Sequence, residues 1–134
     1  EVPVLAPESF MHDLRQSGQW LISAATDLLR ANARHGATGI LKLAHLADHH
    51  ATRIELNGPG GLFGLVHAHL VCAIDNTSYY EYFPGGSRDV AGKEIGLLNP
   101  PTPQNGMIAP PAGPGWGAEW DWDHFRKRRT AFLA

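Results

Sequence analysis

The sequence predicts an α/β fold in which short parallel strands alternate with longer helices. Three observations support this prediction. The β-type runs are short, segments with helical hydrophobic periodicity separate them, and the 134 residues suit a single domain. Because a helix that joins two strands in one sheet returns the chain to the same end, such strands are parallel and the crossovers right-handed.

The first elements are a strand, a helix and a second strand. Val2 to Ala6 is a short β-type run, and Pro7 and Glu8 follow it. Ser9 is expected to cap a helix that carries Leu14, reaches Gln16 and stops at Gly18. A second strand is expected within residues 27–31, ending near Arg30 or Asn32.

The next elements repeat the alternation. A turn at residues 35–39 opens a helix with a clear apolar stripe over residues 40–47. Thr52 to Leu56 alternates like a strand and ends in the turn-forming run 57–61. Leu62 to Ile74 indicates a largely buried helix, and Ser78 to Phe83 is rich in β-forming residues and predicts a last strand.

The character of the sequence changes at Pro84, which divides the chain into segments 1–83 and 84–134. Prolines and glycines are dense between residues 84 and 117, so this segment is expected to be irregular. It is expected to lie across the barrel that the strands and helices of residues 1–83 would help to form, or against another domain. A short helix is expected over 123–132. Burial of three tryptophans should anchor this extension: Trp116, Trp120 and Trp122.

Composition narrows the classes of function. The net charge is −2, and the basic run at 126–129 is flanked by acidic residues, so a solvated helix face is favoured over a nucleic-acid site. No apolar stretch approaches the roughly 20 residues that cross a bilayer. Cys72 is the single cysteine, so an internal disulfide is impossible and the cytoplasm is the expected compartment. Because Cys72 lies in an apolar run, its thiol is predicted to be buried.

Polar residues stand where the predicted strands end. These positions are Glu8, then Arg30 or Asn32, then Asn57, then Glu81. In a parallel barrel the chemistry lies at the carboxyl ends of the strands, and carboxylates with amide or cationic groups suit a metal-and-carboxylate site. The alternative is that Glu8 and Glu81 are ordinary solvated residues at strand ends, and spacing alone leaves both interpretations open.

Several segments together resemble a known family. Residues 2–8 resemble the fifth-strand segment of the enolase superfamily, in its mandelate racemase/muconate lactonizing enzyme branch, and residues 36–47 resemble the turn and helix after the sixth strand. Residues 79–81 resemble the eighth strand, and residues 112–117 resemble the Pro/Gly-rich C-terminal tail. The resemblance implies the C-terminal part of a (β/α)7β TIM-like barrel, strands five to eight.

The resemblance also implies partners and site residues. Such enzymes hold Mg²⁺ with carboxylates from three strands, and Glu8 matches the third of these ligands. Glu81 matches the acid that donates a hydrogen bond to the substrate carboxylate, while a base removes the α-proton. The rest of the barrel and a capping domain would complete the enzyme, which is expected to be a homo-oligomer. Without them the piece should expose a sheet edge and an apolar inner face.

The chain departs from the family pattern at the usual Asp-His dyad of strands six and seven. Asn57 stands at the seventh-strand position, and Asn32 or Arg30 at the sixth. Since an amide cannot take up a proton near pH 7, the base must lie elsewhere, for example on a strand-two lysine. Arg30, Asn32 and Asn57 could bind a polyhydroxy acid, which favours an acid-sugar dehydratase. A racemase or epimerase, or a non-catalytic half-barrel, are the alternatives.

Overall fold

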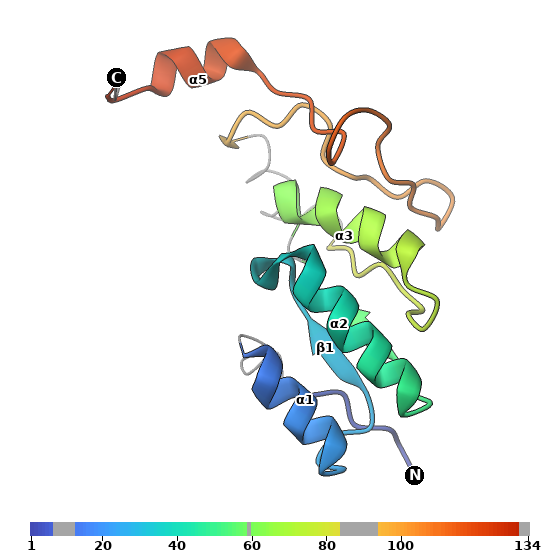
Figure 1. Cartoon of the computed structure of the whole chain (residues 1–134). Coiled ribbons are helices and arrows are strands. Elements are labelled where there is room, and N and C mark those ends of the chain that lie inside the picture. The colour runs from blue at the N-terminus through green and yellow to red at the C-terminus, as the bar shows by residue number, and fades with distance from the viewer. Residues whose placement is uncertain (7–12, 59, 84–93, 132–134) are drawn as a thin grey trace.

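The computed structural model describes residues 1–6, 13–58, 60–83 and 94–131. The elements in chain order are α1 (Leu14–Ile22), β1 (Leu29–Ala31), the 3₁₀ turn η2 (Ala33–His35), α2 (Gly36–His49), β2 (Ile54–Leu56), α3 (Gly61–Ala73) and α5 (Trp122–Arg128). Figure 1 shows α1, α2 and α3 following one another beside the strands, with α5 at the far end of the chain. The alternation of strands and helices predicted from the sequence is confirmed.

The strands are parallel and lie in sequence order. β1 pairs with β2 in the register Leu29↔Ile54, Arg30↔Glu55 and Ala31↔Leu56. Two isolated parallel bridges extend this sheet, Leu5↔Leu28 on one side and Leu56↔Tyr80 on the other. Four parallel segments therefore stand side by side, and their carboxyl ends meet at one edge.

The two outer segments are less regular than the sequence predicts. Residues 78–83 form only the bridge at Tyr80, because the Glu55 carboxylate accepts hydrogen bonds from the backbone N–H groups of Ser78 (3.2 Å) and Tyr79 (3.3 Å). These N–H groups therefore donate to a side chain and do not take part in hydrogen bonds between strands. The predicted strand over residues 2–6 is likewise reduced to the bridge at Leu5.

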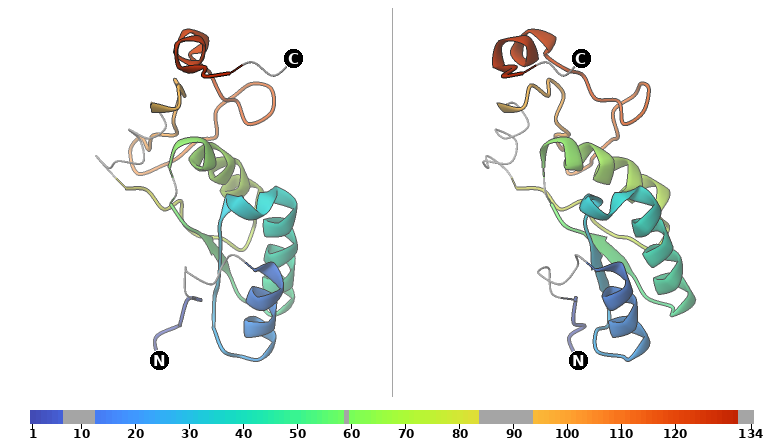
Figure 2. Two further views of the ribbon diagram at one scale, coloured as in Figure 1. Left: turned by 90° about the vertical axis from the view of Figure 1, so that its left-hand side faces the viewer. Right: turned by 60° about the vertical axis from the view of Figure 1, so that its left-hand side comes forward.

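The core lies between the strands and one layer of helices. Leu29, Ala31, Ile54 and Leu56 are buried against residues of α2 and α3, among them Ile40 and Leu70. Figure 2 shows the three helices on the same side of the strands. Since side chains alternate along a strand, Arg30 and Glu55 project from the opposite face. The inner face is therefore not uniformly apolar, which corrects the prediction from the sequence.

The first helix differs from the prediction because Gly18 does not end it. Asp13 caps α1 by accepting from the N–H groups of Arg15 (2.8 Å) and Gln16 (3.2 Å). The helix then runs through Gly18, where a Cβ would lie 3.2 Å from Leu46 Cδ2, so the glycine allows α1 to approach α2. Ser9, the predicted cap, lies outside the described residues.

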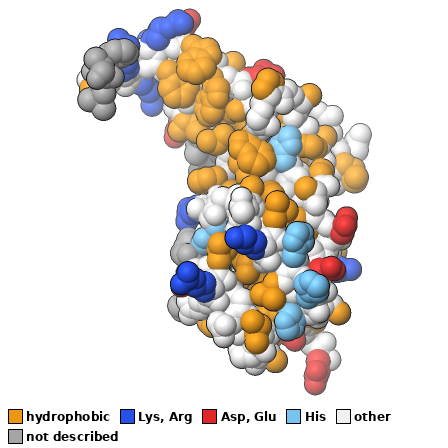
Figure 3. Space-filling view, viewed as in Figure 1, with side chains coloured by type: hydrophobic (Ala, Val, Ile, Leu, Met, Phe, Trp, Pro, Cys, Tyr) orange, Lys and Arg blue, Asp and Glu red, His pale blue; other side chains and the backbone are white. Residues whose placement is uncertain are grey.

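The C-terminal part of the chain exposes much of its apolar surface. Within this chain Trp116 is 39% exposed and Trp122 is 63% exposed, so their burial against the barrel or another domain stays a prediction. Figure 3 shows hydrophobic side chains gathered over the α5 end of the molecule. Arg126 and Lys127 lie exposed on α5, which confirms a solvated basic face. Among the described helices, none has the length and apolar character needed to cross a bilayer.

Cys72 is also more exposed than the sequence predicts. It lies near the end of α3, where Leu70 and Ile74 face the core while Cys72 and Ala73 are exposed. Together with residues such as Tyr79 and Met107 it lines a shallow cavity of about 300 Å³. The prediction of a buried structural thiol is therefore wrong.

Candidate functional site

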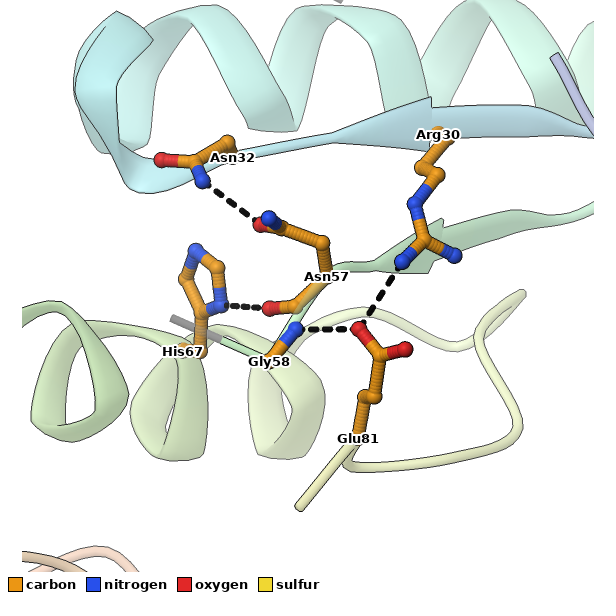
Figure 4. Close-up of polar contacts among 6 residues, drawn as sticks. All are labelled: Arg30, Asn32, Asn57, Gly58, His67 and Glu81. Atoms are coloured by element: carbon orange, nitrogen blue, oxygen red, sulfur yellow. Dashed lines mark hydrogen bonds and ion pairs between the residues drawn. The ribbon is translucent and has the colours of Figure 1, made fainter. Parts of the chain in front are cut away.

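The polar residues predicted at the strand ends come together at one edge of the sheet. Arg30 is the middle residue of β1, Asn32 follows that strand, Asn57 follows β2, and Glu81 follows the bridge at Tyr80. Figure 4 shows their side chains converging at this edge. Asn57 and Glu81 therefore lie at the same end of the sheet, as the alternation of strands and helices predicts. Glu8 lies outside the described residues.

Glu81 is held by two donors from the neighbouring strands. Its Oε2 accepts from Arg30 Nη2 at 2.8 Å and from the backbone N–H of Gly58. The Arg30 side chain is 14% exposed and that of Glu81 35%, so water screens this ion pair only in part. Because Oε2 is an acceptor here, any hydrogen bond that Glu81 donates to a substrate must come from Oε1.

Asn32 and Asn57 form a buried amide pair whose orientation follows from their partners. Asn32 Oδ1 accepts from the backbone N–H of Arg34 at 2.8 Å, so its Nδ2 is the group that faces Asn57. That Nδ2 donates to Asn57 Oδ1 at 2.6 Å. The sequence leaves open whether Arg30 or Asn32 belongs to the site. The structure brings both to this edge of the sheet, Arg30 beside Glu81 and Asn32 beside Asn57.

His67 belongs to this cluster, although no pattern in the sequence indicates it. It lies on α3, only 1% exposed, with Nε2 2.7 Å from the N–H of Ala33 and Nδ1 2.7 Å from the carbonyl oxygen of Asn57. Burial lowers the pKa of His67 from 6.5 to about 4, although the carbonyl of Asn57 and the charge of Glu81 favour the protonated ring. Its position within an apolar helical run is typical of a core residue, so periodicity gives no signal of the contact.

The depressed pKa predicts a pH dependence of stability. Between pH 6.5 and about 4, the unfolded chain binds a proton at His67 that the folded chain does not, so the free energy of unfolding falls as the pH drops. The loss across this window should reach about 3 kcal/mol. Urea unfolding at several pH values should show that His67→Phe lacks this part of the slope. Equal slopes for both proteins would refute the prediction.

The donor groups at this edge do not by themselves suit a magnesium ion. Within the described ranges, no group of three or more His, Cys, Asp or Glu side chains is arranged to hold a metal. Glu81 is already paired with Arg30, and a guanidinium repels a nearby cation. A magnesium site at this edge would therefore need Glu8 and carboxylates from outside the described residues.

Comparison with known proteins identifies the family. The model of the family described as enolase C-terminal domain-like matches residues 1–124. The chain belongs to this family. Its place in the mandelate racemase/muconate lactonizing enzyme branch of the enolase superfamily, expected from the resemblance, is confirmed. No curated protein matches the sequence.

Three solved structures share the fold of this enolase-superfamily chain. A candidate mandelate racemase/muconate lactonizing enzyme from Pseudovibrio sp. is 21% identical, with a TM-score of 0.82 over 98% of this chain. A corresponding protein from Labrenzia alexandrii DFL-11 is 23% identical, with a TM-score of 0.71 over 100%. A candidate L-alanine-DL-glutamate epimerase from Burkholderia xenovorans strain LB400 is 21% identical, with a TM-score of 0.68 over 93%. The chain spans 35%, 34% and 31% of these proteins, respectively.

Proposed function

We propose that this chain forms strands five to eight of the barrel of an enzyme that removes the α-proton of a carboxylate substrate, and that the reaction is dehydration of an acid sugar. The observation that carries the proposal is the joint placement of Arg30 with Glu81 and of Asn32 with Asn57 at the carboxyl ends of successive parallel strands. This is the edge at which barrel enzymes bind substrates.

The chemistry of these groups favours a polyhydroxy acid. A guanidinium provides donors for a carboxylate, and amides can both donate to and accept from hydroxyl groups. The edge therefore offers one cation, one anion and two amides within a small area, which is a poor match for an apolar substrate. An acid sugar carries both the carboxylate and the hydroxyl groups that this set of side chains would recognise.

The described residues of the site contain no suitable base. Asn32 and Asn57 are amides, Arg30 keeps its charge, and Glu81 is assigned to the substrate carboxylate instead. His67 has both ring nitrogens engaged with the backbone and is buried, so it cannot reach a substrate. A single base from outside this group, such as a strand-two lysine, suffices for dehydration. Racemisation through a planar intermediate needs an acid or base on each face.

Magnesium is the cofactor of this proposal, with Glu8 as one of its ligands. When bound, the metal would stabilise the negative charge that develops on the substrate carboxylate as the α-proton leaves. The residues of this chain would orient the substrate: Arg30 through its guanidinium and Asn57 through its amide. Asn32 is only 1% exposed and would act by holding the Asn57 amide. Glu81 would hold the substrate carboxylate through a hydrogen bond from Oε1, for which its carboxylate must take up a proton as the substrate binds.

A metal-binding measurement tests the role of Glu8. Magnesium prefers nearly octahedral oxygen coordination and binds weakly to one carboxylate, so residues 1–134 alone should not bind Mg²⁺ tightly. Isothermal titration calorimetry should show tight binding only for the full-length protein, and Glu8→Gln should weaken it. Tight binding by residues 1–134 that Glu8→Gln abolishes would contradict this assignment.

Racemisation or epimerisation is the second candidate, because one of the neighbours of similar fold is a candidate epimerase. Proton NMR of the full-length protein with a panel of acid sugars and amino-acid derivatives separates the two. Dehydration yields a 2-keto-3-deoxy acid, whereas epimerisation in D₂O inverts and deuterates the α-carbon without loss of water. A protein that catalyses neither reaction and exchanges no α-proton would support the third interpretation, a non-catalytic half-barrel.

A further inference from the structure

His67 connects the ends of the two central strands. Its ring lies between the N–H of Ala33, in the η2 turn after β1, and the carbonyl oxygen of Asn57, directly after β2. Both distances are 2.7 Å, and the side chain is 1% exposed. Figure 4 shows the ring beside Asn57, on the side away from Glu81. Through His67, α3 is hydrogen-bonded to the ends of both strands.

The protonation of this ring is fixed by its partners. A backbone N–H can only donate, so Nε2 must accept from Ala33 and carries no proton. A carbonyl oxygen can only accept, so Nδ1 must carry the proton that it donates to Asn57. The ring is therefore neutral, in the Nδ1–H tautomer, and protonation of Nε2 would break the bond to Ala33.

Two separate chains of hydrogen bonds lead from η2 to Asn57. In one, the N–H of Ala33 donates to His67, which donates to the backbone carbonyl of Asn57. In the other, the N–H of Arg34 donates to Asn32, which donates to the side-chain oxygen of Asn57. The backbone and the side chain of Asn57 are each held by a chain of hydrogen bonds from one short turn. Packing of the core alone does not require these hydrogen bonds, since an apolar side chain would fill the same space without the cost of burying an imidazole.

We propose that His67 is a positioning residue, which sets the position of Asn57 and, through it, the geometry of the Asn32–Asn57 pair beside Gly58 and Glu81. It acts through Asn57 and touches no reacting atom. The role of Asn57 toward substrate rests on the proposed function, whereas the geometric role of His67 does not.

The first test measures the tautomer. Long-range ¹H–¹⁵N spectra of the full-length protein, labelled at histidine and asparagine, should show at pH 7 a neutral His67 with its proton on Nδ1. A spectrum with the proton on Nε2, or with both nitrogens protonated, would overturn the proposal, because Nε2 could not then accept from Ala33.

The second test compares two substitutions. His67→Phe keeps the bulk of the ring and removes both hydrogen bonds, whereas His67→Gln retains one acceptor and one donor. Hydrogen exchange at the side-chain amide of Asn32 should accelerate about tenfold in His67→Phe, as expected for a weakened buried hydrogen bond, and return close to the wild-type rate in His67→Gln. His49→Gln, at an exposed position of α2, is the matched control and should leave the rate unchanged.

The outcomes separate the alternatives. An Asn32 amide that exchanges at the wild-type rate in His67→Phe, or equal acceleration in both variants, would overturn the positioning role. If His67→Phe does not fold, the tautomer measurement decides. Neither measurement needs a substrate. If both give the expected result but the protein does not dehydrate acid sugars, the proposed function is refuted and the positioning role of His67 is still supported.

Discussion

A methyl group added at Gly58 is expected to separate Glu81 from Arg30 and to disable the site. A Cβ at this position would lie 2.6 Å from the carbonyl oxygen of Glu81 and 3.0 Å from its carbonyl carbon. Because these are backbone atoms, the segment that carries Glu81 must move. Gly58→Ala should therefore lower the free energy of unfolding by about 1–3 kcal/mol and reduce kcat/KM of the full-length protein about 100-fold.

Gly18→Ala is the matched control for this substitution. At Gly18 the added methyl group would meet only Leu46 Cδ2 at 3.2 Å, the tip of a flexible side chain, and alanine favours a helix by up to about 1 kcal/mol. Denaturant unfolding and steady-state kinetics should thus show little loss in Gly18→Ala. If Gly58→Ala kept the activity and stability of the wild type, the close approach of Gly58 to Glu81 would not matter for function.

Local sequence signals predicted most of the fold. The apolar stripe at residues 40–47 corresponds to α2, because helical periodicity reports directly on which face is buried. The continuous apolar run at residues 62–74 corresponds to α3, because a helix that is apolar on most sides is largely buried. The predicted end of the first helix at Gly18 is wrong, because contact between α1 and α2 outweighs the low helix propensity of glycine. That contact depends on residues distant in sequence, so no local pattern reveals it.

The site was predictable in its position but not in its contacts. Asn57 and Glu81 could be placed at one edge because parallel strands end together. The Arg30–Glu81 ion pair joins residues 51 positions apart, and the His67–Ala33 hydrogen bond spans 34. Such contacts depend on strand register and side-chain direction. His67 also lies in an apolar helical run, where a histidine gives no sign of a role at the strand ends.

Replacement of Asn57 should weaken the binding or orientation of substrate without removing proton abstraction. In Asn57→Ala the buried donor of Asn32 loses its acceptor, and the amide proposed to bind the substrate is lost. The expected cost is about 1–3 kcal/mol, seen mainly as a raised KM. Replacement of the true base, a strand-two lysine under this proposal, should instead lower kcat about 10²–10⁴-fold while substrate binding stays largely intact.

Exchange of the α-proton with solvent is the most direct test, because it follows the chemical step that is assigned to a base outside this chain. The full-length protein, its Asn57→Ala variant and the strand-two lysine variant would be incubated with an acid-sugar substrate in D₂O, and deuterium at the α-carbon followed by NMR. The account predicts exchange in Asn57→Ala and its loss in the lysine variant. If Asn57→Ala abolished exchange while the lysine variant retained it, the assignment of roles, and with it the proposed dehydratase, would be wrong.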